Sequence, residues 1–536
     1  MRITRRALIT VVALAAAAGG WRLFWFLTDD AYIAFRYASN ALFGRGLVWN
    51  PAPFLPVEGY TSFLWVVLLE LMWRVTGLEP PAVANWLSLG FGWGSLLIGI
   101  RAVERLSLPE RLARHRTWIL IIVLAGVLTN RTFLAWLSSG LETSLFNFCV
   151  LWWLFAALAP AGSRGMWWTA SLSASAAACA LTRPDGLIVF GASILILLHH
   201  GRRTGQRGWR WAGCGTLLAV PGHLIWRRQT YGEWLPNTYY AKHVAAWPEA
   251  GWRYLASFVV EYGVWVWLIA LGILTVSFLR SRRRGLKLGE NLHACAAIAA
   301  LLAHAGYYTL VIGGDHFEYR IYSHLIIPLF VSFVWIVSRI SLRPAVLFAS
   351  LLVFLSVSWP VPWIHWARTR NLETRTETHF LFREIAPAFP AFLRPAVSAW
   401  DGWQSWLTEH RVCVRHQEHK VFYDYQIRSW ITREQGLEIP WSERNVLAHG
   451  TVGVPGWMLP HVAIIDLAGL NDRVIARHPV EPDKIRLMAH DRSPPPGYVA
   501  CYRPNVTLEV HGPKIMIRRE PLTDDEIRAC EEAWNK

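Results

Sequence analysis

The sequence predicts a polytopic α-helical membrane protein that carries a soluble mixed α/β domain at its C-terminal end. Of the 536 residues, 54% are hydrophobic and only 17% are charged, with a mean hydropathy of +0.27. This charged fraction is low against the roughly 25% typical of soluble proteins. The positive excess belongs to one part of the chain: residues 1–363 hold 31 basic and 15 acidic residues, whereas residues 364–536 hold 22 of each. We therefore divide the chain into a membrane module, 1–363, and a soluble domain, 364–536.

Eleven apolar runs supply the predicted membrane spans. Crossing a bilayer takes about 20 mostly apolar residues. A further apolar stretch runs from Thr61 to Thr76. If it crossed the membrane, every later loop would change sides and the basic loops would lie outside. It also holds Glu70 and Arg74, which suit the depth of the lipid headgroups, so we predict a helix that lies in the membrane interface. The spans are placed at 8–27, 83–103, 117–136, 143–160, 166–181, 187–199, 211–226, 254–279, 291–312, 321–340 and 344–363.

Charged residues between the spans set the expected orientation. The N-terminal segment and alternate loops, including 202–210 and 280–290, hold 20 basic and 3 acidic residues, which is typical of cytoplasmic loops. The N-terminus is then cytoplasmic and the C-terminal domain lies outside. Charges that punctuate apolar runs argue against a nucleic-acid-binding face. A cleaved signal peptide at Met1 to Trp21 is the alternative for the first span, but its apolar run continues to Leu27 and favours an uncleaved helix.

The C-terminal region has the pattern of a small mixed α/β domain. Strand-like runs occur at Val462 to Ile465 and at Lys514 to Arg518. The region also holds Cys413, Cys501 and Cys530. A disulfide between Cys413 and Cys501 is possible in an oxidising compartment, although three cysteines allow three pairings and the sequence does not choose among them. No CxxC or CxxH spacing occurs, so a structural zinc site is not expected.

Two adjacent aspartates, Asp29 and Asp30, follow the first span directly, on the predicted outer side. Charged groups near a membrane are unfavourable unless they have a role, and paired carboxylates suit general-base chemistry or a divalent cation. The alternative is a helix N-cap formed by Thr28 or Asp29. A cap accounts for one acid and leaves the second unexplained.

Other outer segments carry further candidate binding residues. Glu142 stands at the start of the fourth span, where a carboxylate also suits the helix dipole. Arg183 and Asp185 flank a proline in a Pro-Asp-Gly sequence, which is by itself a strong turn signal. Two longer loops offer cations for a phosphate and rings for stacking on a sugar or an isoprenoid chain, unless they are solvated connectors. Their candidates are Asn237, Tyr239, Tyr240, Lys242, Asp315, His316 and Arg320.

A set of short motifs follows the outer segments in order along the chain. They are Asp29-Asp30-Ala31-Tyr32-Ile33-Ala34-Phe35-Arg36-Tyr37, Val57-Glu58-Gly59-Tyr60, Ser139-Gly140-Leu141-Glu142-Thr143, Arg183-Pro184-Asp185-Gly186, Pro236-Asn237-Thr238-Tyr239-Tyr240-Ala241-Lys242, Gly313-Gly314-Asp315-His316 and Ile465-Asp466-Leu467-Ala468-Gly469-Leu470-Asn471-Asp472. In this order they resemble the polytopic lipid-linked glycosyltransferases of the C-type (GT-C) fold, in particular the branch that contains the mycobacterial terminal arabinofuranosyltransferase. The resemblance covers most of the chain, and the first outer loop is its most specific part.

The resemblance implies an enzyme that takes a sugar from a polyprenyl phosphate and passes it, with inversion, to an acceptor hydroxyl. The nearest branch implies arabinofuranose as the donor sugar, a periplasmic cell-envelope glycan or glycoprotein as the acceptor, and the bacterial inner membrane as the location. The phosphate leaves without a proton, so one carboxylate base and one cationic phosphate site are the minimum requirement. We expect the C-terminal domain to cover the active site or bind the acceptor, with the Gly-, Pro- and Trp-rich stretch 440–460 forming a loop over the groove.

The family roles transfer to individual positions as follows. The base falls on Asp29 or Asp30, and we favour Asp29. Glu142 takes the second acidic position, where contacts with metal, sugar or acceptor are expected. A divalent cation (Mg²⁺, Mn²⁺ or Ca²⁺) held by these three carboxylates is a possible addition. The expected phosphate contacts are Lys242, Arg320 and Arg183, and the other expected substrate contacts are Tyr32, Arg36, Glu58, Tyr60, Asp185, Asn237, Tyr239, Tyr240, Asp315 and His316.

Two other functional classes are compatible with a polytopic membrane protein. A transporter or flippase of lipid-linked sugars predicts polar residues at mid-membrane depth and inverted repeats, whereas the acids here gather at the outer face and the sequence has no visible internal repeat. A non-catalytic membrane scaffold can keep the fold of an enzyme. The presence of Asp29, Asp30 and Glu142 argues against that alternative.

Overall fold

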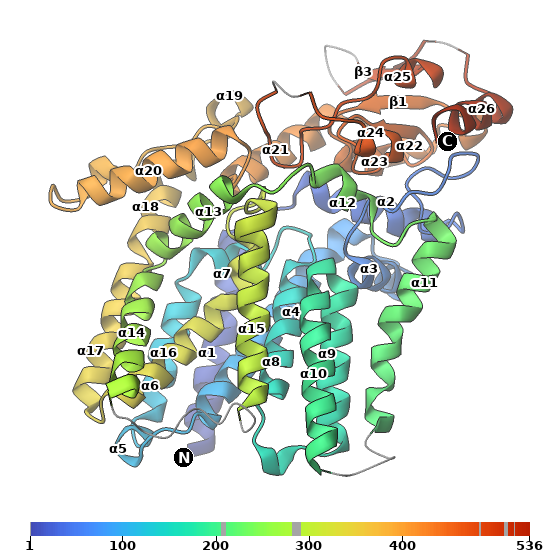
Figure 1. Cartoon of the computed structure of the whole chain (residues 1–536). Helices are drawn as coiled ribbons and strands as arrows, with labels where there is room; N and C mark the ends of the chain where they lie inside the picture. Colours follow the sequence, from blue (N-terminus) through green and yellow to red (C-terminus); the bar gives the residue numbers. More distant parts are fainter. Residues whose placement is uncertain are drawn as a thin grey trace.

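The computed structural model describes residues 2–204, 211–280, 291–481, 484–508, 513–518 and 520–535. It is an upright bundle of long helices with a layer of shorter helices and two small sheets at one end (Figure 1). The N-terminus lies at the other end of the bundle (Figure 1). Positions 205–210 and 281–290, which belong to the predicted cytoplasmic loops 202–210 and 280–290, lie outside the described residues.

The bundle consists of apolar helices that coincide with the predicted spans. Six segments of the described chain are long and apolar enough to cross a membrane, and a bent pair of helices makes a seventh if it counts as one span. The chain is therefore a multi-pass membrane protein, as predicted, while the number of eleven spans stays a prediction. The bundle helices are α1 (Arg2–Leu23), α4 (Pro80–Arg105), α6 (Arg116–Leu128), α8 (Thr143–Ala157), α9 (Met166–Thr182), α10 (Leu187–Thr204), α11 (Ala219–Tyr231), α14 (Val264–Arg280), α15 (Leu292–Tyr307), α16 (Ile326–Ile340) and α17 (Pro344–Ser358).

The bent pair divides one apolar run between the outer layer and the bundle. Helix α13 (Pro248–Glu261) lies in the outer layer and α14 continues into the bundle at an angle of 88°. The turn contains Gly263, whose φ is +61°. A Cβ atom at this position would lie 2.4 Å from the side chain of Val357 in α17. Only glycine satisfies both the left-handed backbone and this close contact.

The predicted interface helix is present as α3 (Phe63–Thr76), separate from the bundle helices. It packs against α2 (Asp29–Leu42) and α4. Its inner side buries Trp65, Val66 and Leu69, while Glu70 and Arg74 pair on the outer side. The helix is thus amphipathic, as a segment lying on a membrane surface should be.

The outer layer carries the remaining elements and covers the end of the bundle opposite the N-terminus (Figure 1). Strand β1 (Val446–His449) pairs in parallel with β2 (Ala463–Asp466), and β3 (Val506–Leu508) pairs antiparallel with β4 (Ile515–Ile517). These strands confirm the two strand-like runs. The helices of this layer are α2, α7 (Arg131–Ala135), α12 (Asn237–Lys242), α13, α18 (Pro360–Thr369), α19 (Arg375–Thr378), α20 (Arg394–Glu409), α21 (His416–Ser429), α22 (Arg433–Leu437), α23 (Gly453–Met458), α24 (Arg473–Arg477), α25 (Tyr498–Cys501) and α26 (Asp524–Trp534); α5 (Glu110–Ala113) lies at the opposite end.

A buried ionic network joins the C-terminal region to α7, α13 and the loop before α16. Arg415 contacts Glu261 at 3.0 Å and Glu318 at 3.4 Å, and Arg131 contacts Glu318 at 2.6 Å. All four side chains are at most 5% exposed. Each charge therefore depends on its partners, because an unpaired charge at such a depth is strongly unfavourable. The predicted domain boundary at 363/364 falls inside α18 and stays a prediction.

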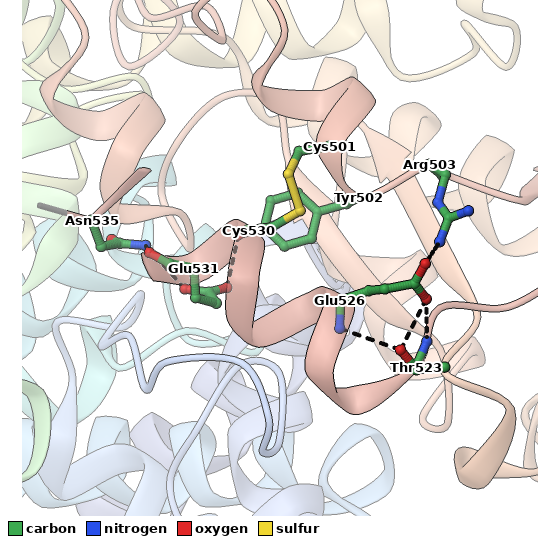
Figure 2. Close-up of a disulfide and its surroundings, with 8 residues drawn as sticks. All are labelled: Cys501, Tyr502, Arg503, Thr523, Glu526, Cys530, Glu531 and Asn535. Atoms are coloured by element: carbon green, nitrogen blue, oxygen red, sulfur yellow. Dashed lines mark hydrogen bonds and ion pairs between the residues drawn. A yellow bond between two sulfur atoms is a disulfide. The ribbon is translucent and has the colours of Figure 1, made fainter. Parts of the chain in front are cut away.

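The disulfide differs from the pairing considered in the sequence. Cys501 in α25 bonds to Cys530 in α26, closing 29 residues of chain (Figure 2). Cys413 is a buried free thiol, and its backbone N–H donates to the carbonyl of Asp315 at 2.8 Å. The Cys413–Cys501 pairing is therefore wrong. The fold places Cys413 at the junction with the bundle and the other two cysteines in neighbouring helices.

Candidate functional site

The two adjacent aspartates begin α2, and the structure gives them different surroundings. Thr28 caps the helix, accepting a hydrogen bond from the backbone of Ala31 at 3.2 Å. Asp29 is buried and accepts hydrogen bonds from two backbone N–H groups of α23, Val454 at 2.8 Å and Gly453 at 3.1 Å. Burial, with repulsion from Asp30, raises the pKa of Asp29 to about 7 although both hydrogen bonds act in the opposite direction. Asp29 therefore joins the first outer loop to the C-terminal region.

The contact between Asp29 and α23 explains a glycine in the C-terminal region. A Cβ atom at Gly453 would lie 1.8 Å from the backbone oxygen of Asp29. No side chain fits that space without moving one of the two helices. The stretch 440–460 therefore packs closely on α2, and its residues 452–457 are buried, whereas the sequence favoured a loop over a groove.

Asp30 and Lys242 are the open charged groups of the site. Asp30 is half-buried, and no hydrogen bond or ion pair reaches its carboxylate from any described residue. Lys242, at the end of α12, is also half-buried and without a partner among the described residues. Burial lowers the pKa of Lys242, and the nearby charge of Asp30 partly offsets that effect. The unpaired carboxylate of Asp30 and the unpaired ammonium group of Lys242 thus lie close enough for their charges to interact.

Two arginines border Lys242 and are already paired with acids. The guanidinium of Arg320 donates to Asp315 at 2.7 and 3.2 Å and lies over the ring of Phe317, 4.5 Å from its centre. The charges of Arg320 and Arg183 both act on Lys242. The three cations of the predicted phosphate site are therefore neighbours in the structure. They lie 59 to 137 residues apart in the chain, and only folding of the bundle brings them together.

The second acidic position belongs to a network around Arg183. Its guanidinium donates to Glu142 at 2.8 Å, to Asp185 at 3.1 Å and to the hydroxyl of Tyr308 at 2.7 Å. Asp185 also accepts from Tyr308 at 2.8 Å and contacts the ring nitrogen of His304 at 3.1 Å. The network fixes Arg183 and Glu142 in place. Glu142 is therefore paired with the guanidinium of Arg183 and does not form a pair with another carboxylate.

Several predicted substrate contacts are buried and bonded within the protein. Arg36 donates to four backbone carbonyls, among them Gly456 at 2.7 Å and Val462 at 2.8 Å. Glu58 pairs with Arg227 at 2.6 Å. The other members of this group are Tyr60, which bonds to Tyr231 at 3.2 Å; Asn237, which donates to the carbonyls of Gly469, Leu470 and Asp472; and Tyr32, whose hydroxyl lies 3.2 Å from that of Tyr423. These contacts position the outer loops against the C-terminal region.

The remaining predicted contacts divide between the site and the surface. Tyr239 is 37% exposed and stacks on His243. Tyr240 bonds to Glu233 at 3.3 Å and lies beside the guanidinium of Arg477. His316 is close to Lys242, whose charge lowers its pKa, while burial is the larger cause of a pKa of about 4. Of these three, His316 belongs to the open part of the site.

The C-terminal region contributes groups that the sequence did not indicate. His419 of α21 and His490 lie beside His316, with ring centres 5.2 and 5.4 Å away. Asp466 at the end of β2 faces the two aspartates, since it repels Asp29 and is itself repelled by Asp30. The sequence did not indicate His419 and His490, because isolated histidines without metal-ligand spacing point to no site. Asp466, in contrast, belongs to one of the motifs on which the family resemblance depends.

The arrangement of the acids does not fit the possible divalent cation. Within the described ranges, no three His, Cys, Asp or Glu side chains are arranged to hold a metal ion. Asp29 is occupied by two backbone N–H groups and Glu142 by Arg183, which leaves Asp30 as the open carboxylate of the proposed ligand set. A hard cation needs about six oxygen ligands. We therefore derive no step through a metal.

Comparisons with known proteins agree with the fold. No protein-family model matches the chain. The terminal β-(1→2)-arabinofuranosyltransferase of Corynebacterium glutamicum is 29% identical over an alignment of 372 positions that covers 60% of this chain and 50% of that protein. The structure of ArnT from Cupriavidus metallidurans bound to undecaprenyl phosphate aligns over 89% of both chains with a TM-score of 0.52 and 12% identity. The apo form of ArnT aligns over 86% of both chains with a TM-score of 0.49.

The fold and its outer site define a polytopic membrane protein of the GT-C fold. Within this class, the sequence relationship is to a terminal arabinofuranosyltransferase, which confirms the resemblance predicted from the outer-loop motifs. The chain spans about half the length of this curated relative.

Proposed function

We propose that the protein is an inverting glycosyltransferase that moves a sugar from a polyprenyl phosphate to an acceptor hydroxyl. Two observations outside the site support this function. ArnT, which shares the fold, binds undecaprenyl phosphate, and the related curated protein is a glycosyltransferase. The contacts of the candidate site residues give the remaining support.

The observation that carries the proposal is the open carboxylate of Asp30 near the open ammonium group of Lys242. In the proposed step, the acceptor oxygen attacks the anomeric carbon and its proton passes to Asp30. The bond between the anomeric carbon and the phosphate oxygen breaks, and the phosphate keeps the electron pair. Lys242, with Arg320 and Arg183, stabilises the charge of the leaving phosphate. A single displacement of this kind inverts the anomeric centre.

The base assignment differs from the one favoured in the sequence. Asp29 is surrounded by protein, because both carboxylate oxygens accept backbone hydrogen bonds. A general base needs hydrogen-bond access to the proton that it removes. Asp30 has that access, so we assign the base to Asp30 and a positioning role to Asp29.

We further propose arabinofuranose as the transferred sugar and a periplasmic cell-envelope glycan or glycoprotein as the acceptor. The support is the relationship to the arabinofuranosyltransferase. We also propose the bacterial inner membrane as the location, with the N-terminus in the cytoplasm. The basic loops support this orientation. Helices α2 and α12, which carry Asp30 and Lys242, lie at the end of the bundle opposite the N-terminus (Figure 1). This orientation places the site on the periplasmic side.

The test is transfer of radiolabelled arabinose from synthetic polyprenyl-phosphoryl arabinofuranose in proteoliposomes. The variants are Asp30→Asn and Lys242→Met, and the matched control is Asp525→Asn, an exposed acid of α26. We expect transfer by the wild type and the control, loss of transfer in both site variants, and no effect of a chelator. Transfer that survives Asp30→Asn removes the proposed base.

Two other outcomes of this assay would change the proposed function in different ways. Transfer of other lipid-linked sugars but not arabinose would replace the donor and keep the mechanism. Movement of the lipid-linked sugar across the bilayer without transfer would favour a transporter, and neither activity would favour a scaffold.

A further inference from the structure

Three histidines meet beside the proposed base. His316 follows the loop Gly313–Gly314, His419 lies in α21, and His490 lies in the irregular segment before α25. The ring of His316 is 5.2 Å from that of His419 and 5.4 Å from that of His490. His419 also packs against Phe317, with ring centres 4.4 Å apart. Two of the three therefore come from the C-terminal region and one from an outer loop of the bundle.

Each of these rings is held through one nitrogen by a backbone carbonyl. Nδ1 of His316 lies 2.7 Å from the carbonyl oxygen of Arg411, and Nδ1 of His490 lies 2.7 Å from that of Met488. His419 bonds to the carbonyl of Val414, and its Nε2 is buried without a partner. A carbonyl oxygen only accepts, so the bonded nitrogen of each ring carries the N–H. In a neutral ring the other nitrogen is then an acceptor.

Backbone contacts place His490 next to Lys242. Arg492 donates to the carbonyl of Tyr240 at 3.0 Å, and Arg486 donates to that of Ala246 at 3.2 Å. The segment that carries His490 thus bonds on both sides of Lys242. It is also bound to the end of α20 through Met488, whose N–H donates to the carbonyl of His410 at 3.0 Å.

Burial keeps the three rings neutral, and the charges that act on two of them show that they lie near Asp30 and Lys242. The charge of Asp30 acts on His490, and that of Lys242 acts on His316. Burial lowers the pKa of His316 to about 4 and that of His490 to about 3, and it lowers the pKa of His419 as well. The free nitrogens are therefore unprotonated near neutral pH.

This chemistry selects the kind of ligand. An unprotonated ring nitrogen offers a lone pair and repels a phosphate oxygen, so these rings do not suit the leaving group. No group of three such side chains in the described chain is arranged to hold a metal ion. A buried polar atom without a partner, such as Nε2 of His419, is unfavourable unless a ligand completes its bonding. The matching ligand is a set of hydroxyl groups.

We propose that His316, His419 and His490 form the acceptor subsite, where their free ring nitrogens accept hydrogen bonds from the hydroxyls of the incoming sugar. This inference rests on the proposed function and specifies which side of the site the acceptor occupies. The attacking hydroxyl gives its proton to Asp30, while neighbouring hydroxyls donate to the histidines. The rings hold the acceptor and take no proton in the reaction.

The test measures acceptor and donor kinetics separately, with a synthetic octyl arabinofuranosyl disaccharide as the acceptor probe. We expect His490→Ala to raise the acceptor KM about three- to tenfold, the effect of one lost hydrogen bond between neutral groups, and to leave the donor KM unchanged. His490→Gln keeps an acceptor atom and should recover much of the loss. The matched control is His461→Ala, because His461 also bonds through Nδ1 to a carbonyl, that of Ile439 at 2.8 Å, but packs against Phe43.

Binding of the same probe, followed by titration calorimetry, separates this inference from the proposed function. Weaker binding in His316→Ala, His419→Ala and His490→Ala supports the subsite even if no sugar is transferred. An unchanged acceptor KM and unchanged probe binding in all three variants overturn it. A rise in the donor KM alone also overturns it, since the rings would then serve the phosphate. Thermal unfolding of each variant shows whether the protein is folded, and the glutamine variant at the same position replaces any alanine variant that is not.

Discussion

Asparagine substitutions at the two adjacent aspartates of α2 should have opposite effects on stability and on transfer. Asp30→Asn removes a carboxylate that has no hydrogen bond or ion pair with any described residue, so the unfolding free energy should change by less than about 0.5 kcal/mol. The same change removes the proposed general base. Loss of such a base lowers the rate about 10²- to 10⁴-fold.

Asp29→Asn should mainly lower stability. The carboxylate accepts from Val454 at 2.8 Å and from Gly453 at 3.1 Å, whereas an asparagine offers one oxygen and turns an NH₂ group toward the second N–H. One buried backbone donor is then left unpaired, at a cost of about 1–3 kcal/mol. Because α23 also packs on Arg36 and Trp49 through Gly456, a shift of this helix should disturb the first outer loop, with a smaller loss of transfer than in Asp30→Asn.

Both effects can be measured on the same detergent-purified samples. Thermal unfolding gives the stability, and initial rates of sugar transfer give the activity at a temperature where all variants are folded. The reasoning is refuted if Asp29→Asn is as stable as the wild type and inactive while Asp30→Asn remains active, because the two carboxylates would then have exchanged roles.

Three further predictions concern the supporting structure. Replacing Cys501 and Cys530 by serine should lower the stability of the outer layer by about 3–4 kcal/mol, the chain-entropy value for a loop of 29 residues; a reductant should lower the melting temperature of the wild type (Figure 2) but not of this variant. Arg415→Met leaves Glu261 buried and unpaired and should cost about 3–5 kcal/mol, and adding Glu261→Gln should restore part of it; equal stability of the single and double variants contradicts the pairing. Burial raises the pKa of Asp472 to about 7, so the stability that its protonated form contributes is complete below about pH 4 and is lost as the pH rises through 7. Melting temperatures of the wild type relative to Asp472→Asn should fall over that range, and parallel curves would exclude the effect.

Much of the helical architecture could be predicted because it follows from local composition. The apolar runs coincide with bundle helices, and the stretch with Glu70 and Arg74 forms the separate helix α3. Strands β2 and β4 fall on the two runs rich in apolar residues of the C-terminal region. A bilayer imposes length and hydrophobicity on each span, so these features are readable one segment at a time.

The individual roles of the site residues could not be predicted in the same way. Asp29 and Asp30 are adjacent in the sequence, yet they differ because α23, more than 400 residues later, supplies two N–H groups to one of them. Arg36 lies in the same motif and donates to three backbone carbonyls of the C-terminal region. A motif indicates which residues belong to a site and does not indicate which of them remain open to a ligand.

The sequence by itself determined the class of fold, the positions of the apolar runs, and the grouping of acidic and basic residues in the segments between them. These depend on hydrophobicity and charge, which each segment carries regardless of its partners. Only the tertiary structure decided that Cys501 pairs with Cys530, that Asp30 is the open carboxylate, and that His419 and His490 reach the site beside His316. The reason is physical: a disulfide, an unpaired charge and a binding surface depend on distances between segments that are remote in the chain, and those distances are set by packing.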